Sequence, residues 1–236
     1  MPKGDQFTIL IGSRARGTAD EYSDIDIVRV GHKRAVSQKE LTRLAGVDAH
    51  VSYIDYDSDI FRSLHESGSL FIHHILTEGK LLAGDPRKWK QLARDFRVVR
   101  DLSPEIKEQL RLCKWLARVN KSDQSTMPLL SHMFRALKNA AIFSLAQRGV
   151  YVYDKRAALR RAFPSLTKRD IELLVTANNA FVRGAPRFTK SRSAAAIAAL
   201  PRLVEKLSSI SGELLNNGQK TNSQRHSKGN QKSGAV

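Results

Sequence analysis

The first third of the chain alternates between short apolar runs and polar turns, which is typical of a small sheet with helices around it. An apolar, β-branched run over residues 7–12 ends at a glycine and predicts a buried strand. Residues 24–30 and 47–54 alternate polar and apolar side chains with a period of two, so each predicts a further strand. A short helix is expected over residues 37–45, with Ser37 as its N-cap.

In the next part of the chain the apolar residues recur with the period of an α-helix. Those from Ile60 to Leu76 fall on one stripe, and Gly79 follows as a stop signal. Thr167 and Asp170 form a capping-box pattern at the start of a later helix. The same period predicts further helices over residues 104–118, 127–148, 167–182 and 193–211.

These two patterns divide the chain into a mixed part and an all-helical part. Gly84-Asp85-Pro86 is a turn signal, so we expect a first domain over residues 1–84 and a helical domain over residues 85–212. The tail, residues 213–236, has too few apolar side chains to order itself and predicts disorder. The expected fold class is α+β: a small mixed sheet with flanking helices, followed by an all-α helical bundle.

The net charge of +17 is distributed unevenly. It is zero over residues 1–90, +14 over residues 91–211 and +3 over residues 212–236. Such a concentration of cations favours a polyanionic partner, RNA or DNA, for the helical domain, although a solvated basic surface has the same composition. Aromatic residues suited to base stacking are few in this part, and each suits a core equally well: Trp115, Phe143, Tyr151 and Tyr153.

Cysteine content and hydropathy exclude several classes of protein. The single cysteine, Cys113, excludes a disulfide within the chain and a cysteine-rich zinc site. No apolar stretch reaches the ~18 residues of a membrane span. The N-terminus lacks the pattern of a signal peptide. We therefore expect a cytoplasmic protein without a membrane partner.

Paired carboxylates stand on the second predicted strand. Asp24 and Asp26 project from the same face, because strand residues two apart share a face. Two neighbouring carboxylates repel each other unless a cation lies between them, and hard oxygen ligands on a rigid strand suit Mg²⁺. Asp48, on the third predicted strand, supplies a third carboxylate. Three carboxylates that hold two metal ions form a clamp for in-line displacement at phosphorus. We predict two Mg²⁺ ions, with Mn²⁺ as an alternative, and these aspartates as catalytic, metal-binding residues.

A glycine–serine pair closes the first predicted strand. Gly12 lets the backbone approach a phosphate, and the hydroxyl of Ser13 can donate to it. The polar residues 13–23 predict a loop or a short helical turn. Arg14 and Arg16 lie on this turn, where their charges would balance those of a triphosphate.

Taken together, Gly12–Gly17 and Ser23–Val28 resemble the signature of the polymerase-β-like nucleotidyltransferase superfamily. They are most similar to the minimal nucleotidyltransferases and the kanamycin-nucleotidyltransferase type. The family pattern is Gly-Ser, a spacer of about ten residues, Asp-x-Asp, and a later strand with Val-Asp, which Val47-Asp48 matches. The resemblance covers residues 7–83, and it departs from the family where the first strand begins, since many members have a helix before it.

The resemblance implies a role for each matching residue. Asp24 and Asp26 would ligate Mg²⁺, and Asp48 would ligate metal or deprotonate an acceptor hydroxyl. Gly12 and Ser13 would hold the β- and γ-phosphates of an NTP, with ATP favoured. The reaction implied is attack by the hydroxyl on the α-phosphate, with release of pyrophosphate.

The helical part resembles, more weakly, the HEPN-like four-helix domain that accompanies such modules. The ribonuclease motif of HEPN domains, an arginine four to six residues before a histidine, is absent from residues 91–211. In related enzymes a basic helix of the second domain covers the triphosphate. That role points to Arg135 and Lys138, which share one face of a predicted helix.

The acceptor is less sharply defined than the reaction. The basic helical domain favours a nucleic acid, such as tRNA or an oligonucleotide. A protein hydroxyl, AMPylated within a toxin–antitoxin or phage-defence system, is the alternative that fits the minimal nucleotidyltransferases. A cationic aminoglycoside would require an acidic pocket, which the charge disfavours. A catalytically inactive binding module with the same fold is the alternative that is not an enzyme.

Overall fold

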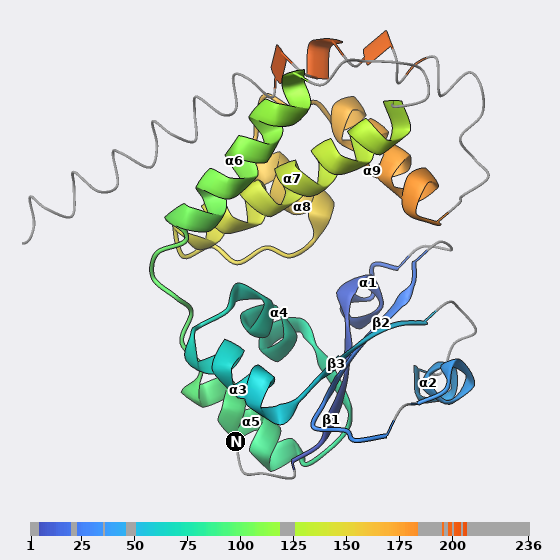
Figure 1. Cartoon of the computed structure of the whole chain (residues 1–236), viewed down its shortest axis with the longest axis vertical. Coiled ribbons are helices and arrows are strands. Elements are labelled where there is room, and N and C mark those ends of the chain that lie inside the picture. The colour runs from blue at the N-terminus through green and yellow to red at the C-terminus, as the bar shows by residue number, and fades with distance from the viewer. Residues whose placement is uncertain are drawn as a thin grey trace, which may run out of the picture. The chain divides into compact units, whose positions relative to one another are not determined.

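The computed structural model describes residues 5–19, 23–34, 36–45, 51–118 and 126–183, and beyond them residues 195, 198, 199, 201–203, 205 and 206 (Figure 1). The chain forms two compact units, which we call the sheet unit (Met1–Arg100) and the helical unit (Asp101–Val236). Among the described helices, none combines the length and apolar character needed to cross a bilayer.

The sheet unit is built on a four-stranded sheet in the order β3-β2-β1-β4. The strands are β1 (Phe7–Ile11), β2 (Ile25–Val30), β3 (Val51–Tyr56) and β4 (Lys80–Ala83). β1 is antiparallel to both β2 and β4, whereas β2 and β3 are parallel, so the sheet is mixed as expected. Every residue of β1 is buried, because helices cover both faces of the sheet at this strand.

Two apolar cores lie on the two faces of the sheet. Helices α3 (Ser58–Glu66), α4 (Leu70–Glu78) and α5 (Pro86–Asp95) cover one face, and α1 (Gly12–Arg16) and α2 (Gln38–Ala45) lie on the other side (Figure 1). The side chains of the first core include Phe7, Ile9, Val28, Phe61, Ile75 and Trp89. Those of the second include Leu10, Ala15, Ile25, Ile27, Leu41 and Val51.

Several elements differ from the sequence-based expectation. The single helical stripe expected from Ile60 to Leu76 is two helices, broken at Ser67–Ser69, where Val99 N donates to Gly68 O at 2.9 Å. Ile60 is 56% exposed, so it does not belong to the buried stripe. Strand β4 and helix α5 were not anticipated. Because α5 inserts Trp89 into the first core, the sheet unit extends past residue 84 to Arg100.

The helical unit contains α6 (Ser103–Arg118), α7 (Thr126–Ala146), α8 (Lys155–Ala162) and α9 (Lys168–Arg183). α7 is buried along most of its length and packs against α6, α8 and α9. The described residues of this unit contain no strand, as expected. α8 was not anticipated; its N-cap Asp154 accepts a hydrogen bond from Ala157 N at 2.8 Å. The tail over residues 213–236 lies outside the described residues.

The capping box at the start of α9 is confirmed. Asp170 N donates to Thr167 Oγ1 at 3.2 Å, and Thr167 N donates to Asp170 Oδ2 at 3.0 Å. Asp170 is fully buried and also accepts from Lys206 Nζ at 2.7 Å and from Arg202 Nη2. Burial alone would raise the pKa of Asp170, but the hydrogen bonds from Lys206 and Thr167 outweigh it and hold that pKa below its usual value.

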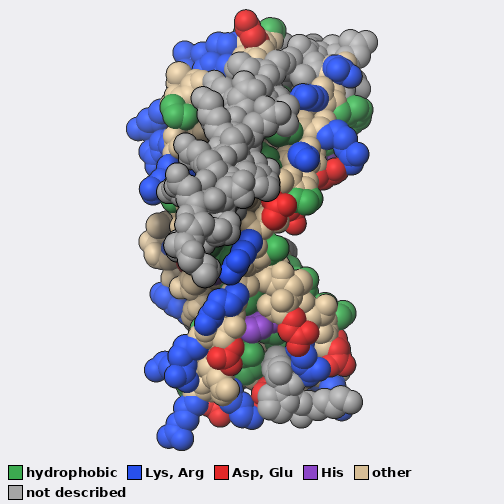
Figure 2. Space-filling view, turned by 90° about the vertical axis from the view of Figure 1, so that its left-hand side faces the viewer, with side chains coloured by type: hydrophobic (Ala, Val, Ile, Leu, Met, Phe, Trp, Pro, Cys, Tyr) green, Lys and Arg blue, Asp and Glu red, His purple; other side chains and the backbone are tan. Residues whose placement is uncertain are grey.

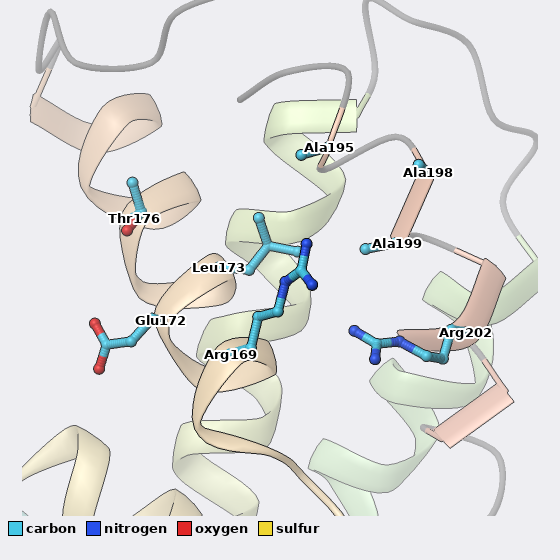
Figure 3. Close-up of a pocket in the computed structure, with 8 residues that line it drawn as sticks. All are labelled: Arg169, Glu172, Leu173, Thr176, Ala195, Ala198, Ala199 and Arg202. Atoms are coloured by element: carbon cyan, nitrogen blue, oxygen red, sulfur yellow. The ribbon is translucent and has the colours of Figure 1, made fainter. Parts of the chain in front are cut away.

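A cavity of about 520 Å³ lies between α9 and the described residues Ala195, Ala198, Ala199 and Arg202 (Figure 3). Its lining is mainly apolar, with Leu173 and three alanines, while Arg169 and Arg202 extend toward it. The residues that line it include no nucleophile beyond Thr176 and no cluster of metal ligands, so the cavity offers no chemistry of its own.

Candidate active site

The glycine–serine turn and the Asp-x-Asp strand meet at one end of the sheet. Antiparallel pairing sets Ile11 opposite Asp26, so Gly12, the next residue, lies beside the Asp26 side chain. A Cβ atom at Gly12 would lie 2.5 Å from Asp26 Oδ2. The backbone at Gly12 also has φ +75°, in the left-handed region that favours glycine. Glycine is therefore favoured at position 12 for two reasons. Its backbone has a positive φ, and a Cβ atom there would collide with the Asp26 carboxylate.

Asp26 projects from the side of β2 that carries Val28 and Val30, as the two-residue period predicts, and Asp24 immediately precedes the strand. Both aspartates are half-buried, whereas Ile25 and Ile27 are buried in the core of the opposite face. The strand thus fixes a pair of carboxylates at the end of the turn. Carboxylate oxygens in this setting are ligands of the kind that Mg²⁺ prefers.

The third predicted carboxylate, Asp48, lies outside the described residues, as do all of residues 46–50. β3 begins at Val51 and runs parallel to β2, with Ser52 paired to Asp26. Among the described residues, no three His, Cys, Asp or Glu side chains are grouped closely enough to hold a metal ion. The described part of the site therefore supplies a pair of carboxylates, and the role of Asp48 stays a prediction.

Arg14 ties the turn to the strand. Its Nε and Nη2 donate to Ser23 O at 3.1 and 2.8 Å. Ser23 immediately precedes Asp24, so this fork holds the backbone from which the first aspartate projects. The sequence predicted that the charge of Arg14 faces the triphosphate. In the structure the Arg14 guanidinium donates to the Ser23 carbonyl, which precedes the Asp-x-Asp strand.

Arg16 is anchored to α4 by a cluster that the sequence analysis missed. Arg16 Nη1 donates to Glu78 Oε2 at 2.8 Å, and His74 Nε2 lies 3.3 Å from the same oxygen. All three side chains are at most a quarter exposed. Arg16 Nε is buried and has no hydrogen-bond partner within the described part of the chain. The sequence signal that could have indicated part of this cluster is the spacing of His74 and Glu78, which lie four residues apart and so share one helix face.

Burial decides the charge of the histidine in this cluster, because it favours the neutral form of His74. Desolvation is the main cause that lowers the pKa of His74, and Arg16 lowers it further, while Glu78 raises it. His74 is therefore neutral near pH 7, and Glu78 compensates the positive charge of Arg16. Burial also lowers the pKa of the neighbouring His73.

The last two predicted nucleotide-binding residues, Arg135 and Lys138, lie on α7 in the helical unit. Arg135 is exposed and Lys138 is half-buried, three residues apart on the same side of the helix. Their contribution to nucleotide binding stays a prediction.

The sheet unit thus places a Gly-Ser turn against an Asp-x-Asp strand of a small mixed sheet. Residues 5–88 match the family described as "Polymerase beta, Nucleotidyltransferase". Over residues 5–88 the chain therefore matches a nucleotidyltransferase domain of the polymerase-β type. Nucleotidyltransferases of this family generally use divalent metal ions, which agrees with the half-exposed carboxylates of Asp24 and Asp26.

Two solved structures are also similar to the chain. One is a toxin–antitoxin with AMP-PNP, at 25% identity and a TM-score of 0.26, over 40% of this chain and 72% of that one. The other is spectinomycin adenyltransferase AAD(9) from Enterococcus faecialis with ATP and spectinomycin, at 13% identity and a TM-score of 0.38, over 86% of this chain and 93% of that one. No curated protein matches the chain. The HEPN-like character of the helical unit stays a prediction.

Proposed function

We propose that the chain transfers a nucleoside monophosphate from an NTP, with ATP favoured, to a hydroxyl group of a nucleic acid. A new bond forms between the acceptor oxygen and the α-phosphorus, the bond from the α-phosphorus to the β-phosphate oxygen breaks, and pyrophosphate leaves. The hydroxyl proton passes to a carboxylate of the site. The observation that carries the proposal is the packing of the Asp26 carboxylate against Gly12, which joins the phosphate turn to the carboxylate strand.

Asp24, Asp26 and Asp48 are the residues that would hold the divalent cations. Bound Mg²⁺ would neutralise charge on the phosphates and stabilise the entering and leaving oxygens. The two described carboxylates fit this role, because they stand half-exposed on a strand whose other face is core. Asp48 is proposed as the third ligand or as the group that accepts the proton.

Gly12 and Ser13 are proposed to bind the β- and γ-phosphates through the backbone and the serine hydroxyl. Arg16 has a buried Nε that lacks a partner among the described residues, and such a donor is normally satisfied by water or a ligand. Arg14 holds the adjacent backbone. Arg135 and Lys138 are proposed to add positive charge from the helical unit.

The nucleic-acid acceptor is supported by charge. Residues 91–211 carry a net charge of +14, whereas the residues that contain the proposed catalytic site, 1–90, are neutral overall. A cationic drug would be repelled by such a unit, and a polyanion would be attracted.

The reaction is tested by nucleotide binding. ATP with Mg²⁺ is expected to raise the melting temperature of the wild-type chain, and Asp24→Ala/Asp26→Ala is expected to abolish the shift. Asp59→Asn is the matched control, since it removes a carboxylate of the same unit that is 68% exposed and paired only with Arg62 within the described residues. A shift that persists in the double variant would contradict the assigned site.

The acceptor is tested by transfer of label. The chain is incubated with each α-³²P-labelled NTP and bulk RNA, a cell protein extract or an aminoglycoside. We expect label on RNA that is released by nuclease and lost in the double variant. Label confined to protein or to the drug would refute the nucleic-acid acceptor while leaving nucleotidyl transfer intact.

A further inference from the structure

We propose that the outer face of α6 is a docking surface for single-stranded nucleic acid. The proposal rests on the nucleic-acid acceptor proposed above and assigns a place where that acceptor is held.

An exposed tryptophan marks this face. Trp115 is 61% exposed, more than any other large apolar side chain in the described part of the chain. Its neighbours Cys113 and Leu116 are each only 2% exposed and pack in the core with α7. The helix is therefore firmly seated, yet its largest side chain contributes little to the core. An indole left in water on a well-packed helix is a candidate contact for a partner.

Four cations flank the tryptophan on one side of α6. Lys107, Arg111, Lys114 and Arg118 are all exposed. Their spacing of four, three and four residues places them on one face of the helix, over a length of about 16 Å. Trp115 follows Arg111 by four residues and precedes Arg118 by three, so its ring borders the row.

The row keeps most of its charge. Arg111 Nη2 pairs with Glu108 at 2.5 Å, and within the described residues no other ion pair involves the row. Elsewhere in the unit, Arg156 pairs with Glu172, and both Arg202 and Lys206 pair with Asp170. On the face shown in Figure 2, Lys and Arg side chains gather along both margins of the helical unit.

A cationic row beside an exposed indole fits single strands better than duplexes. The cations bind phosphates irrespective of sequence, and the indole stacks on the face of a base. Base faces are available in single strands and are hidden within a duplex. An acidic protein could use the cations, but a flat aromatic face beside every negative charge is a property of single-stranded nucleic acid.

The chain contains two tryptophans, which makes the test direct. Trp89 is only 8% exposed, in the sheet unit, so quenching by a ligand that stacks reports mainly on Trp115. Titration of the full chain with a 12-mer single strand is expected to quench the fluorescence, and a hairpin of the same composition is expected to quench it much less. Trp115→Ala is expected to weaken binding of a dye-labelled 12-mer about 10-fold, whereas Trp115→Phe retains most of the affinity.

Two control variants test whether binding of the 12-mer depends on the α6 face itself. One changes charge elsewhere in the helical unit, and the other removes an exposed apolar side chain elsewhere. Lys114→Glu/Arg118→Glu is expected to weaken binding. It should also reduce the slope of log affinity against log salt concentration by the amount that corresponds to about two phosphate contacts. Arg160→Glu/Arg161→Glu changes the charge equally on α8, where both residues are exposed, and is expected to weaken binding less. Phe181→Ala, at a residue that is 46% exposed on α9, is expected to leave affinity unchanged.

The outcomes distinguish this proposal from the proposed function. If Trp115→Ala binds the 12-mer as tightly as the wild type does, or if hairpin and single strand bind equally, the α6 proposal is overturned even when RNA is labelled. If the 12-mer binds through Trp115 but no NTP labels RNA, the proposal of a nucleic-acid acceptor is refuted, whereas the proposal of a docking surface on α6 is supported. Trp115→Ala is expected to keep the ATP-dependent thermal shift, which shows that the sheet unit remains folded.

Discussion

A single methyl group added at Gly12 tests the central geometry of the site. Gly12→Ala places a Cβ 2.5 Å from Asp26 Oδ2. Gly17, at the other end of α1, has the same φ of +75°, yet a Cβ there would meet nothing within 4 Å. Gly17→Ala therefore imposes the strain of a positive φ without a collision, and Gly12→Ala combines a positive φ with a collision with the carboxylate.

The expected magnitudes follow from this difference. A non-glycine residue in the left-handed region costs roughly 1–2 kcal/mol, so both variants are expected to lose about that much stability. To restore an ordinary contact near 3.5 Å, the Asp26 carboxylate must move by roughly 1 Å. A displacement of this size at a catalytic group costs about 100-fold in rate. We expect Gly12→Ala to lose about 100-fold in nucleotidyl transfer, and Gly17→Ala to stay within about 3-fold of wild type.

The assay is release of pyrophosphate with saturating ATP, Mg²⁺ and RNA, with urea denaturation as the measure of stability. Equal activity in the two alanine variants would refute the reasoning, because backbone strain alone would then account for both. A Gly12→Ala variant with normal activity would show that Asp26 does not have to lie against the turn.

Three further predictions concern buried charges. Asp170→Asn is expected to lower the free energy of unfolding by about 2–3 kcal/mol in urea denaturation, because it weakens the capping box and two ion pairs of a fully buried carboxylate. Glu78→Gln is expected to lower it by about 1–2 kcal/mol and to reduce the rate of transfer, since Arg16 loses its counter-charge beside the turn. Burial lowers the pKa of His74 from its ordinary value of 6.5, so the unfolded chain takes up a proton first as the pH falls. The stability contributed by neutral His74 is therefore expected to be present well above pH 6.5 and to be lost progressively as the pH falls through 6.5. His74→Gln is expected to reduce that decline in melting temperature.

The strands that carry the site could be predicted because their side chains have a strict local pattern. Residues 24–30 alternate around Asp24 and Asp26, and residues 7–11 form an apolar, β-branched run that includes Thr8, so the period and the composition were enough to predict both strands. The same held for the helix at residues 38–45, where Glu40 N donates to Ser37 Oγ at 3.3 Å as the predicted cap.

The features that were missed depend on contacts between distant residues. Local bonds at Gly68 and Ser69 close α3, and a hydrogen bond from Val99 N to Gly68 O, thirty-one residues apart, adds to them. The anchor of Arg16 is Glu78, sixty-two residues later, and no local pattern links them. Trp115 fits a core or a surface equally well by composition, and only the packing of α6 shows that it faces solvent.

The apolar core determines where the polar site stands. A slip of one residue between β1 and β2 would turn Asp26 into the core of Ile25 and Ile27 and bring an isoleucine to the turn. Such a slip is opposed by β1, whose side chains are buried on both faces of the sheet. Gly12 and Asp26 meet because of this register, and the spacing between the two motifs is a consequence of it. Substitutions that loosen the packing of β1 are therefore expected to lower transfer as well as stability, although they touch no catalytic group.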